Sequence, residues 1–456
     1  MQTVTGVAAP GVHELRTAYS AGALRPRDVV EALLQRIAER GDDGVWITVA
    51  RAEQLHVQAA ELESLPAARR DALPLWGVPV AVKDNIDVAG LPTTAGCPAF
   101  AYSPARDAGA VRRLREAGAI PVGKTNLDQF ATGLNGGRSP HGACESVFGG
   151  DLISGGSSSG SAVAVAAGLV PVALGTDTAG SGRVPAAMNG IVGLKPTRGL
   201  VGASGVVPAC RSLDCVSVFA RDLDDAATVL DVLAGPDPDD PWSRPSAPPP
   251  PTTAVLAFPE ALDFEGDEAM AAAFARVAAR AASHARETIR IDAGPLREAG
   301  DLLYEGPWVA ERLAALEDFL DAHPDDVLPV TRAVIERGAA FSAVDAFRAR
   351  YRLQELRAWA AELFARADVL LLPTLPTTFT RAELVAQPVA RNLVLGRYTQ
   401  FTNLLDLAAV AVPAGTTADG RPHGVTLVGP AFSEARLLAA AARLVPSPVP
   451  PTRRDS

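Results

Sequence analysis

The chain has 456 residues, 48% hydrophobic and 21% charged, so it can bury a large core and has the balance of a globular protein. Its formal net charge is −10 and no basic run is longer than two residues, which argues against a nucleic-acid partner. An anionic substrate would be repelled at long range and must be captured by a local cation.

The first helical patterns lie in residues 12–40 and 51–70, where apolar residues recur at helical spacing. Residues 75–82 then alternate Pro and Gly with Val, which is typical of a strand, and from there to Leu200 the chain is rich in Gly, Ser, Thr and Asn. This part is expected to hold helices at 108–118 and 161–168 and a strand at 170–174. Alternating strands and helices predict an α/β fold, a large mixed sheet with helices on both faces.

Residues 235–253 contain eight prolines and cannot form regular structure. They are either a linker between two parts or a long surface loop inside one domain. The elements expected beyond them are helices at 268–286 and 300–340 and strands at 368–372 and 408–412.

The predicted organisation is one domain over residues 1–445. Its parts are N-terminal helices (12–70), a core (75–235), the Pro-rich loop (235–253), a helical substrate-side part (254–365) and closing strands and helices (366–445), followed by a frayed tail (446–456).

The four cysteines, Cys97, Cys144, Cys210 and Cys215, include no CxxC pair and no metal-ligand spacing, which favours reduced, buried thiols. We expect no metal and no other cofactor. Residues 1–21 lack a basic segment followed by an apolar run, and residues 162–174 are too short to cross a bilayer. These features predict a soluble cytoplasmic protein without a membrane partner.

A nucleotide-binding pattern, GxxxxGK[ST], occurs at residues 118–125 as GAIPVGKT. Such a loop must follow a strand so that its backbone amides surround a phosphate at a helix start. Here the preceding residues are helical, and Ile120, Pro121 and Val122 themselves resemble a strand. We therefore expect no phosphate site.

A second pattern, GSSSG at residues 156–160, matches the GxSxG nucleophile elbow and would make Ser158 the nucleophile. That mechanism needs a preceding strand and a later histidine, but residues 151–155 are a weak strand. His423, expected in a turn after Pro422, is the one credible partner. An esterase of the α/β-hydrolase type using Ser158 and His423 stays open as an alternative.

A third set of motifs is larger and more specific. It consists of LWGVPVAVKDNID (75–87), GGSSSGS (155–161), LGTDTAGSGRVP (174–185) and GLKPT (193–197). In this order and spacing the motifs resemble the amidase-signature family, whose pattern runs GGSSGGS, TDxGGSxRxP and GLKPT. The similarity extends from about Gly77 to Pro430.

The chemistry of amide hydrolysis agrees with these residues. It needs a nucleophile, a proton acceptor and donors for the oxyanion, and no histidine lies near the motifs. Lys83 ends an apolar strand, where burial lowers the pKa of an amine; a drop of ~2 units from about 10.4 would make it a base. On position alone, a surface charge would be the preferred interpretation of Lys83.

The resemblance implies the role of each site residue. Ser181 matches the nucleophile, Lys83 the base, and Ser157 the bridging serine, which in this family follows a cis peptide bond. The backbone N–H groups of Thr178, Ala179, Gly180 and Ser181 match the oxyanion hole. The remaining charges of this segment, Asp177 and Arg183, are expected to support the loop. Two residues depart from the family pattern, Ser159 and Ala179, each in place of a glycine.

Further segments resemble the allophanate hydrolases of this family. They are TNLDQFATG (125–133), SGGSSSGSAVAVA (154–166), GTDTAGSGRVPAA (175–187), VVPACRSLDCVSVFA (206–220), YEGPWVAERLAAL (304–316) and NLLDLAAVAVPAG (403–415). This resemblance implies that Tyr304 and Arg312 bind the carboxylate of the substrate, urea-1-carboxylate, which is cleaved to ammonia and carbon dioxide. An arginine fork suits a carboxylate, although helix position alone would make Arg312 a solvated charge paired with Glu305 or Glu311.

Allophanate hydrolases usually continue into a C-terminal domain that removes the carboxylate of the intermediate. Because this chain stops at Ser456, we expect unaided decarboxylation, a separate protein with that function, or a slightly different substrate. The resemblance also suggests a homodimer. The alternatives within the family are an amidase for another small amide and the glutamine-hydrolysing component of a transamidation complex.

Overall fold

The structure is a computed structural model that describes residues 10–250, 252 and 255–444. The tail expected at 446–456 lies outside these residues. Within the described part, no helix combines the length and the apolar character needed to cross a membrane.

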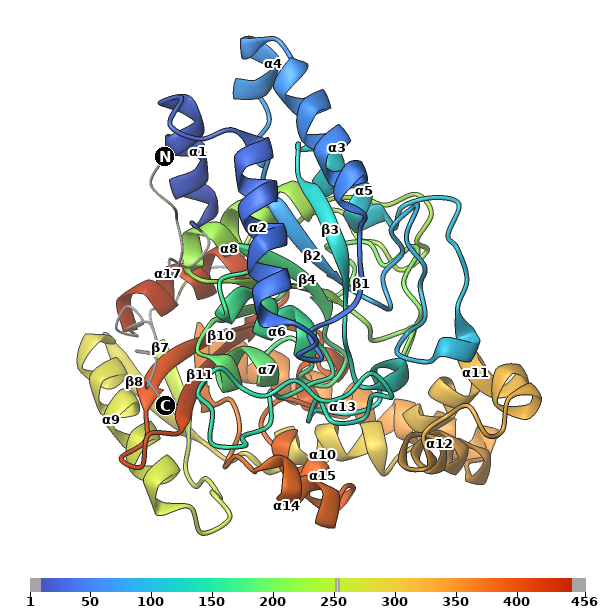
Figure 1. Cartoon of the computed structure of the whole chain (residues 1–456). Coiled ribbons are helices and arrows are strands. Elements are labelled where there is room, and N and C mark those ends of the chain that lie inside the picture. Colours follow the sequence, from blue (N-terminus) through green and yellow to red (C-terminus); the bar gives the residue numbers. More distant parts are fainter. Residues whose placement is uncertain (1–9, 251, 253–254, 445–456) are drawn as a thin grey trace.

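An eleven-stranded mixed sheet forms the centre of the molecule, in the order β1-β3-β2-β4-β6-β5-β10-β11-β9-β7-β8 (Figure 1). Pairing is parallel between β2 and its neighbours β3 and β4, and between β7 and its neighbours β8 and β9; the other pairs are antiparallel. The strands are β1 (Trp46–Val49), β2 (Pro79–Lys83), β3 (Ile120–Thr125), β4 (Val172–Thr176), β5 (Val192–Lys195), β6 (Val216–Ala220), β7 (Val255–Pro259), β8 (Glu287–Ile291), β9 (Val369–Pro373), β10 (Leu407–Thr416) and β11 (Pro422–Pro430).

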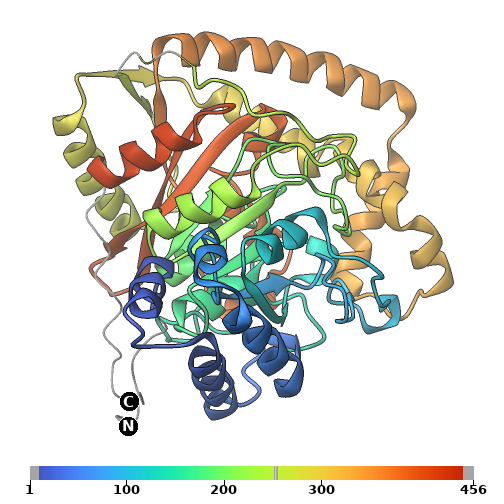
Figure 2. The ribbon, with the colours of Figure 1, turned by 90° about the horizontal axis from the view of Figure 1, so that it is seen from above.

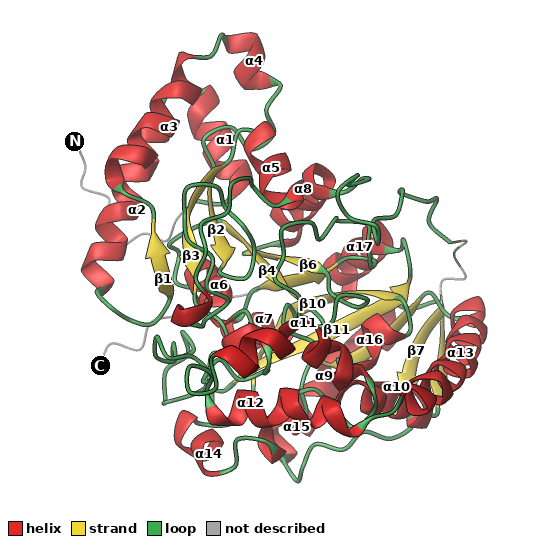
Figure 3. Ribbon diagram, turned by 90° about the vertical axis from the view of Figure 1, so that its right-hand side faces the viewer, coloured by secondary structure: helices red, strands yellow, loops and turns green. Residues whose placement is uncertain are grey.

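Helices pack against both faces of this sheet, as Figure 3 shows for the strands enclosed between them. Along β10, Ala408 and Val410 pack into the apolar cluster that also holds residues of α17, whereas Ala409 packs into the cluster that holds residues of α10 and α16. Alternating residues of a strand point to opposite faces, so the two clusters are two layers of core. The predicted α/β fold with a mixed sheet covered on both faces is confirmed.

The helices are α1 (Val12–Ser20), α2 (Pro26–Arg40), α3 (Ala52–Ser64), α4 (Ala67–Asp71), α5 (Gly109–Glu116), α6 (Ser159–Ala166), α7 (Val184–Asn189), α8 (Leu223–Leu233), α9 (Glu268–His284), α10 (Gly294–Tyr304), α11 (Trp308–Ala322), α12 (Pro329–Glu336), α13 (Ala343–Arg366), α14 (Arg381–Ala386), α15 (Ala390–Leu395), α16 (Phe401–Leu404) and α17 (Glu434–Leu444). The long helix α13 runs along one side of the molecule in Figure 2, where it is orange.

Turn residues divide several segments that the apolar spacing had joined. The predicted helix over 12–40 is two helices, because Gly22 takes a left-handed conformation (φ 67°) and Pro26 starts a new helix. The strand predicted over 75–82 begins only at Pro79, since Gly77 turns with φ 72° against Pro26. These predictions were right in the type of element and wrong in its bounds.

The Pro-rich segment 235–253 joins α8 to β7, and both flanking regions contribute to the same sheet. The sheet therefore includes strands from both sides of this segment. The strands that precede this segment, β1 to β6, meet those that follow it, β7 to β11, where β10 pairs with β5 through residues 409–411.

Candidate active site

Lys83 and Thr176 are brought together by the pairing of two parallel strands. Lys83 is the last residue of β2 and Thr176 the last of β4, and parallel neighbours end at the same edge of a sheet. The Lys83 amine lies 2.7 Å from the Thr176 hydroxyl oxygen and 2.7 Å from that of Ser157. Lys83 is fully buried, so it is not the surface charge that strand position alone allowed.

Ser157 lies two residues before the start of α6. The Gly156–Ser157 peptide bond is cis, as the resemblance implies. Two backbone hydrogen bonds fix this turn: the N–H of Asp128 donates to the Ser157 carbonyl, and the N–H of Gly156 donates to the Leu134 carbonyl. The turn therefore presents the Ser157 hydroxyl to Lys83 from a fully buried position.

Ser181 lies in the loop between β4 and α7, and a buried ion pair shapes that loop. Arg183 donates from Nε and Nη2 to the two carboxylate oxygens of Asp177, at 2.8 and 2.9 Å, and the N–H of Gly182 donates to the same carboxylate. Gly180 has φ 140°, and a side chain there would collide with Thr399. Asp177 and Arg183 thus occupy the supporting positions expected of them.

The donors around Ser181 are free within the described residues. None of the backbone N–H groups of Thr178, Ala179, Gly180 and Ser181, nor the Ser181 hydroxyl, makes a hydrogen bond to another described group. These residues are almost completely buried, at 1–3% exposure for Thr178, Ala179 and Ser181. Buried N–H groups without partners are uncommon in proteins and mark a place where an acceptor can bind.

Burial controls the protonation of Lys83. The pKa of its amine is lowered from 10.5 to about 7, chiefly by desolvation; the nearby carboxylates of Asp128, Asp214 and Asp177 oppose this shift, and Arg312 adds to it. At neutral pH a large share of the molecules therefore carries an uncharged amine, which can accept a proton.

Tyr304 and Arg312 meet in the interior near the loop that follows β3. Arg312 is 1% exposed, and its Nη1 donates to the Thr132 hydroxyl at 2.9 Å, while Nη2 lies 3.5 Å from the Tyr304 hydroxyl. The alternative of a solvated charge paired with Glu305 or Glu311 is wrong for this arginine. Glu311 instead accepts two hydrogen bonds from Ser212.

The elbow interpretation loses its partner residue. His423 lies inside β11 rather than in a turn, is 3% exposed, and neither of its ring nitrogens has a hydrogen-bond partner among the described residues. Burial lowers its pKa to about 4. The Ser158 hydroxyl donates to the Thr176 carbonyl and accepts from the Thr176 N–H, so its contacts are structural.

The nucleotide-binding pattern is also accounted for by the sheet. Its residues Ile120–Thr125 form β3, and Lys124 is buried in an ion pair with Asp84 at 3.2 Å. All four cysteines are free and buried. Among the described residues, no three His, Cys, Asp or Glu side chains are grouped as a metal ion would require.

The sequence interpretation missed the residues that hold the site together. Thr176 is the second partner of the Lys83 amine, and Thr132 anchors Arg312. Asp214 accepts from the Thr178 hydroxyl and from the N–H groups of Ala209 and Cys210. Thr176, Thr132 and Asp214 all lie within the motifs quoted above. Their presence in these motifs was the one sequence feature that could have indicated a role at the site.

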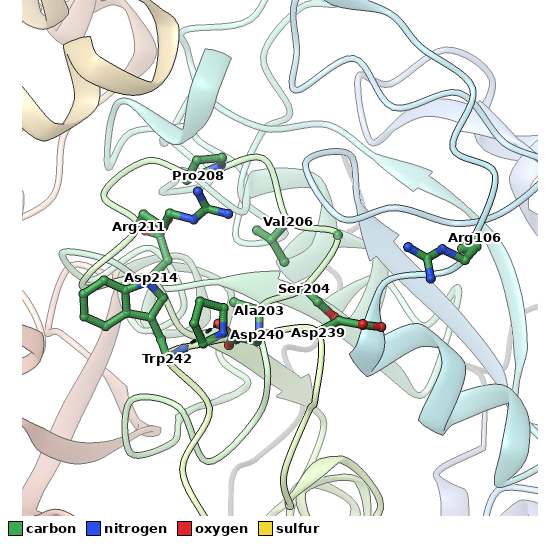
Figure 4. Close-up of a pocket in the computed structure, with 12 residues that line it drawn as sticks. Arg106, Ala203, Ser204, Val206, Pro208, Arg211, Asp214, Asp239, Asp240 and Trp242 are labelled. Carbon is green, nitrogen blue, oxygen red and sulfur yellow. Dashed lines mark hydrogen bonds between the residues drawn. The ribbon is translucent and has the colours of Figure 1, made fainter.

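A surface pocket of about 230 Å³ adjoins the site through Asp214. Figure 4 shows Arg106 and Arg211 on opposite sides of it, with Ser204 and Val206 between them. Lys83, Ser157 and Ser181 do not line this pocket, nor a second one of about 560 Å³ at α14 and α15. The first pocket therefore reaches Asp214, which accepts a hydrogen bond from Thr178, and does not reach the hydroxyl groups of Ser157 and Ser181.

Comparison with known proteins identifies the family of this chain. The family model described as Amidase matches residues 28–438. Urea amidolyase of Saccharomyces cerevisiae is 46% identical over 422 residues, which are 91% of this chain and 23% of that protein. A glutamyl-tRNA(Gln) amidotransferase chain of Natronomonas pharaonis is 36% identical, over 81% of this chain and 96% of that one.

A solved structure of Kluyveromyces lactis allophanate hydrolase superimposes with a TM-score of 0.91 at 43% identity, covering 96% of this chain and 72% of that one. The chain thus spans only about a quarter of the length of the yeast urea amidolyase that it matches. The match to the family model extends over most of the chain and includes the four signature motifs quoted above. The chain belongs to the amidase-signature family and is an amide-hydrolysing enzyme.

Proposed function

We propose that this enzyme hydrolyses allophanate, urea-1-carboxylate, to ammonia and carbon dioxide through a relay of Ser181, Ser157 and Lys83. The assignment of the substrate rests on one observation. Arg312 is a buried guanidinium beside the Tyr304 hydroxyl, and it has no carboxylate partner among the described residues. A buried positive charge is costly unless an opposite charge meets it, and a substrate carboxylate would do so. The similarity to urea amidolyase and to allophanate hydrolase supports the same substrate.

The first half of the reaction forms an acyl-enzyme. Neutral Lys83 accepts the proton of the Ser157 hydroxyl, which lies 2.7 Å away, as Ser157 accepts that of Ser181. The Ser181 oxygen attacks the carbamoyl carbon, and the negative charge moves to the carbonyl oxygen. The free N–H groups of residues 178–181 then donate to that oxygen. The proton returns through Ser157 to the leaving nitrogen, the C–N bond breaks and ammonia departs.

The second half uses the same groups for water. Lys83 and Ser157 accept a proton from a water molecule as it attacks the Ser181 ester, and the proton returns to Ser181 when the ester bond breaks. The released dicarboxylated amine loses carbon dioxide and yields the second ammonia. Arg312 and Tyr304 hold the carboxylate throughout, and because burial raises the pKa of Tyr304, its hydroxyl keeps the proton that it donates.

Ammonia release from a panel of amides tests this proposal. The panel comprises allophanate, biuret, malonamate, glutamine and a simple aliphatic amide, with kcat/KM measured for each. We expect allophanate to exceed biuret, which replaces the carboxylate by an amide, by at least about tenfold. Glutamine is the main competitor, because a glutamyl-tRNA(Gln) amidotransferase chain is 36% identical to this chain. A preference for glutamine or for the aliphatic amide would refute the assignment to allophanate.

A further inference from the structure

Three arginines in the described part of the chain expose less than a tenth of their surface: Arg138, Arg183 and Arg312. Arg183 has the carboxylate of Asp177. Arg138 and Arg312 form no ion pair with any described residue, and their Nε atoms have no hydrogen-bond partner there. A guanidinium cannot release its proton in a protein, so both positive charges persist in the interior.

The two unpaired guanidinium groups meet at one residue. Arg138 Nη1 donates to the Thr132 carbonyl at 2.8 Å, and Arg312 Nη1 donates to the Thr132 hydroxyl at 2.9 Å. The other donor of Arg138, Nη2, binds the Pro388 carbonyl at 2.6 Å. Thr132 follows Phe130 and Ala131, which both have left-handed backbone conformations (φ 51° and 52°), so the chain turns sharply between the two arginines.

The carboxylates whose charges act on these arginines are engaged elsewhere. Asp128 accepts from the backbone N–H groups of residues 135, 136 and 138. Glu311 accepts twice from Ser212, and Asp214 accepts from Thr178, Ala209 and Cys210. None of them forms an ion pair with either guanidinium, so neither arginine has a direct counter-ion among the described residues.

We propose that Arg138 is a second specificity-determining residue, which makes the substrate end of the site selective for amides that carry a carboxylate. This inference rests on the proposed function, in which Arg312 grips the carboxylate. Arg138 acts in two ways: its charge attracts the anion at short range in a medium of low polarity, and its bond to the Thr132 carbonyl fixes the residue that orients Arg312.

Equilibrium binding of malonamate and malonamide tests the proposal. Malonamate has a methylene group in place of the central nitrogen of allophanate, and malonamide is its neutral counterpart. Calorimetry on proteins that carry Ser181→Ala measures both dissociation constants without turnover. We expect Arg138→Gln to weaken malonamate binding about tenfold and malonamide binding less than about threefold. Arg138→Lys keeps the charge and should retain most of the preference for malonamate.

The matched control is Arg36→Gln. Arg36 is half-buried and donates to the Leu169 carbonyl. It lies on α2, which contributes no residue to the site. It should leave both dissociation constants unchanged. The proposal would be overturned if Arg138→Gln weakened the binding of malonamate and malonamide equally, or if Arg138→Gln and Arg138→Lys changed the dissociation constants equally. Arg138 would then only stabilise the loop through its hydrogen bond to Pro388. Failure of wild-type protein to hydrolyse allophanate would refute the proposed function separately.

Discussion

The amine of Lys83 lies 2.7 Å from the hydroxyl oxygen of Ser157, and both side chains are fully buried. The same amine is held from the other side by Thr176, also at 2.7 Å. A neutral amine has one lone pair and two N–H groups, so a donated bond to Thr176 leaves the lone pair for the Ser157 proton. The geometry therefore suits a base, provided that Lys83 is uncharged.

The protonation of Lys83 predicts how activity depends on pH. The uncharged form is needed, and burial lowers the pKa of Lys83 to about 7, so kcat/KM should rise with pH through a single ionisation near that value and level off above it. Lys83→Ala should remove both the rate and this ionisation. A rising limb near the ordinary lysine pKa, about 10, would mean that the amine is not desolvated in solution.

Arg312 should distinguish charged from neutral substrates. Arg312→Ala is expected to raise KM for allophanate roughly ten- to hundredfold, because a hydrogen bond to a charged group is worth ~1.5–3 kcal/mol, and to affect biuret far less. Arg312→Lys should restore only part of the loss, since an ammonium lacks the planar fork. Tyr304→Phe should show a smaller loss of the same kind. Steady-state kinetics on allophanate and biuret measure these effects. An equal rise in KM for both amides would mean that Arg312 has only a structural role.

His423 predicts an acid-sensitive fold. Its pKa is lowered from 6.5 to about 4 by burial, so below pH 6.5 the unfolded chain binds a proton that the folded protein does not. Stability is therefore lost as pH falls from about 6.5 to about 4, by ~2 kcal/mol between pH 7 and pH 5. Urea unfolding of wild type and His423→Gln at both pH values measures this contribution. An identical pH dependence of the two proteins would show that His423 does not carry it, and full activity of the variant would exclude the elbow mechanism.

The buried pair of Asp177 and Arg183 should be far more important for stability than a surface pair. Asp177→Asn leaves the Arg183 guanidinium buried without a counter-charge, at an expected cost of ~3–5 kcal/mol in the free energy of unfolding. The control is Glu298→Gln, which breaks the exposed pair with Arg352 and should cost far less. Similar losses in the two variants would show that burial does not govern the effect.

Much of the fold follows from local patterns in the sequence. Apolar spacing located α5 and α9 nearly to their ends, and residues 234–250 contain no helix or strand, as their proline content indicates. Boundaries failed where one residue changes the backbone direction, as at Gly22 and Gly77, because periodicity is insensitive to a single turn. The pairing order of the sheet depends on contacts between residues far apart in the chain, which local patterns do not contain.

The candidate site divides in the same way. The motifs point to Ser157, Ser181 and Lys83 but not to Thr176 and Thr132, because a threonine has no distinctive signal until its partner is known. His423 was misplaced in a turn because Gly420 and Pro422 precede it, although β11 begins at Pro422 itself. The burial of Arg312 could not be predicted from helix position, since it depends on how α11 packs against the loop after β3.

The most direct test of the account is ammonia release from allophanate by wild type, Ser181→Ala and Ser158→Ala, each checked for folding by its melting temperature. Wild type should turn allophanate over, and Ser181→Ala should lose on the order of 10⁶-fold in rate while keeping its fold, because it lacks the nucleophile. Ser158→Ala removes hydrogen bonds to the Thr176 backbone and should keep substantial activity. A Ser181→Ala protein that still releases ammonia, beside an inactive Ser158→Ala, would contradict the relay of Ser181, Ser157 and Lys83.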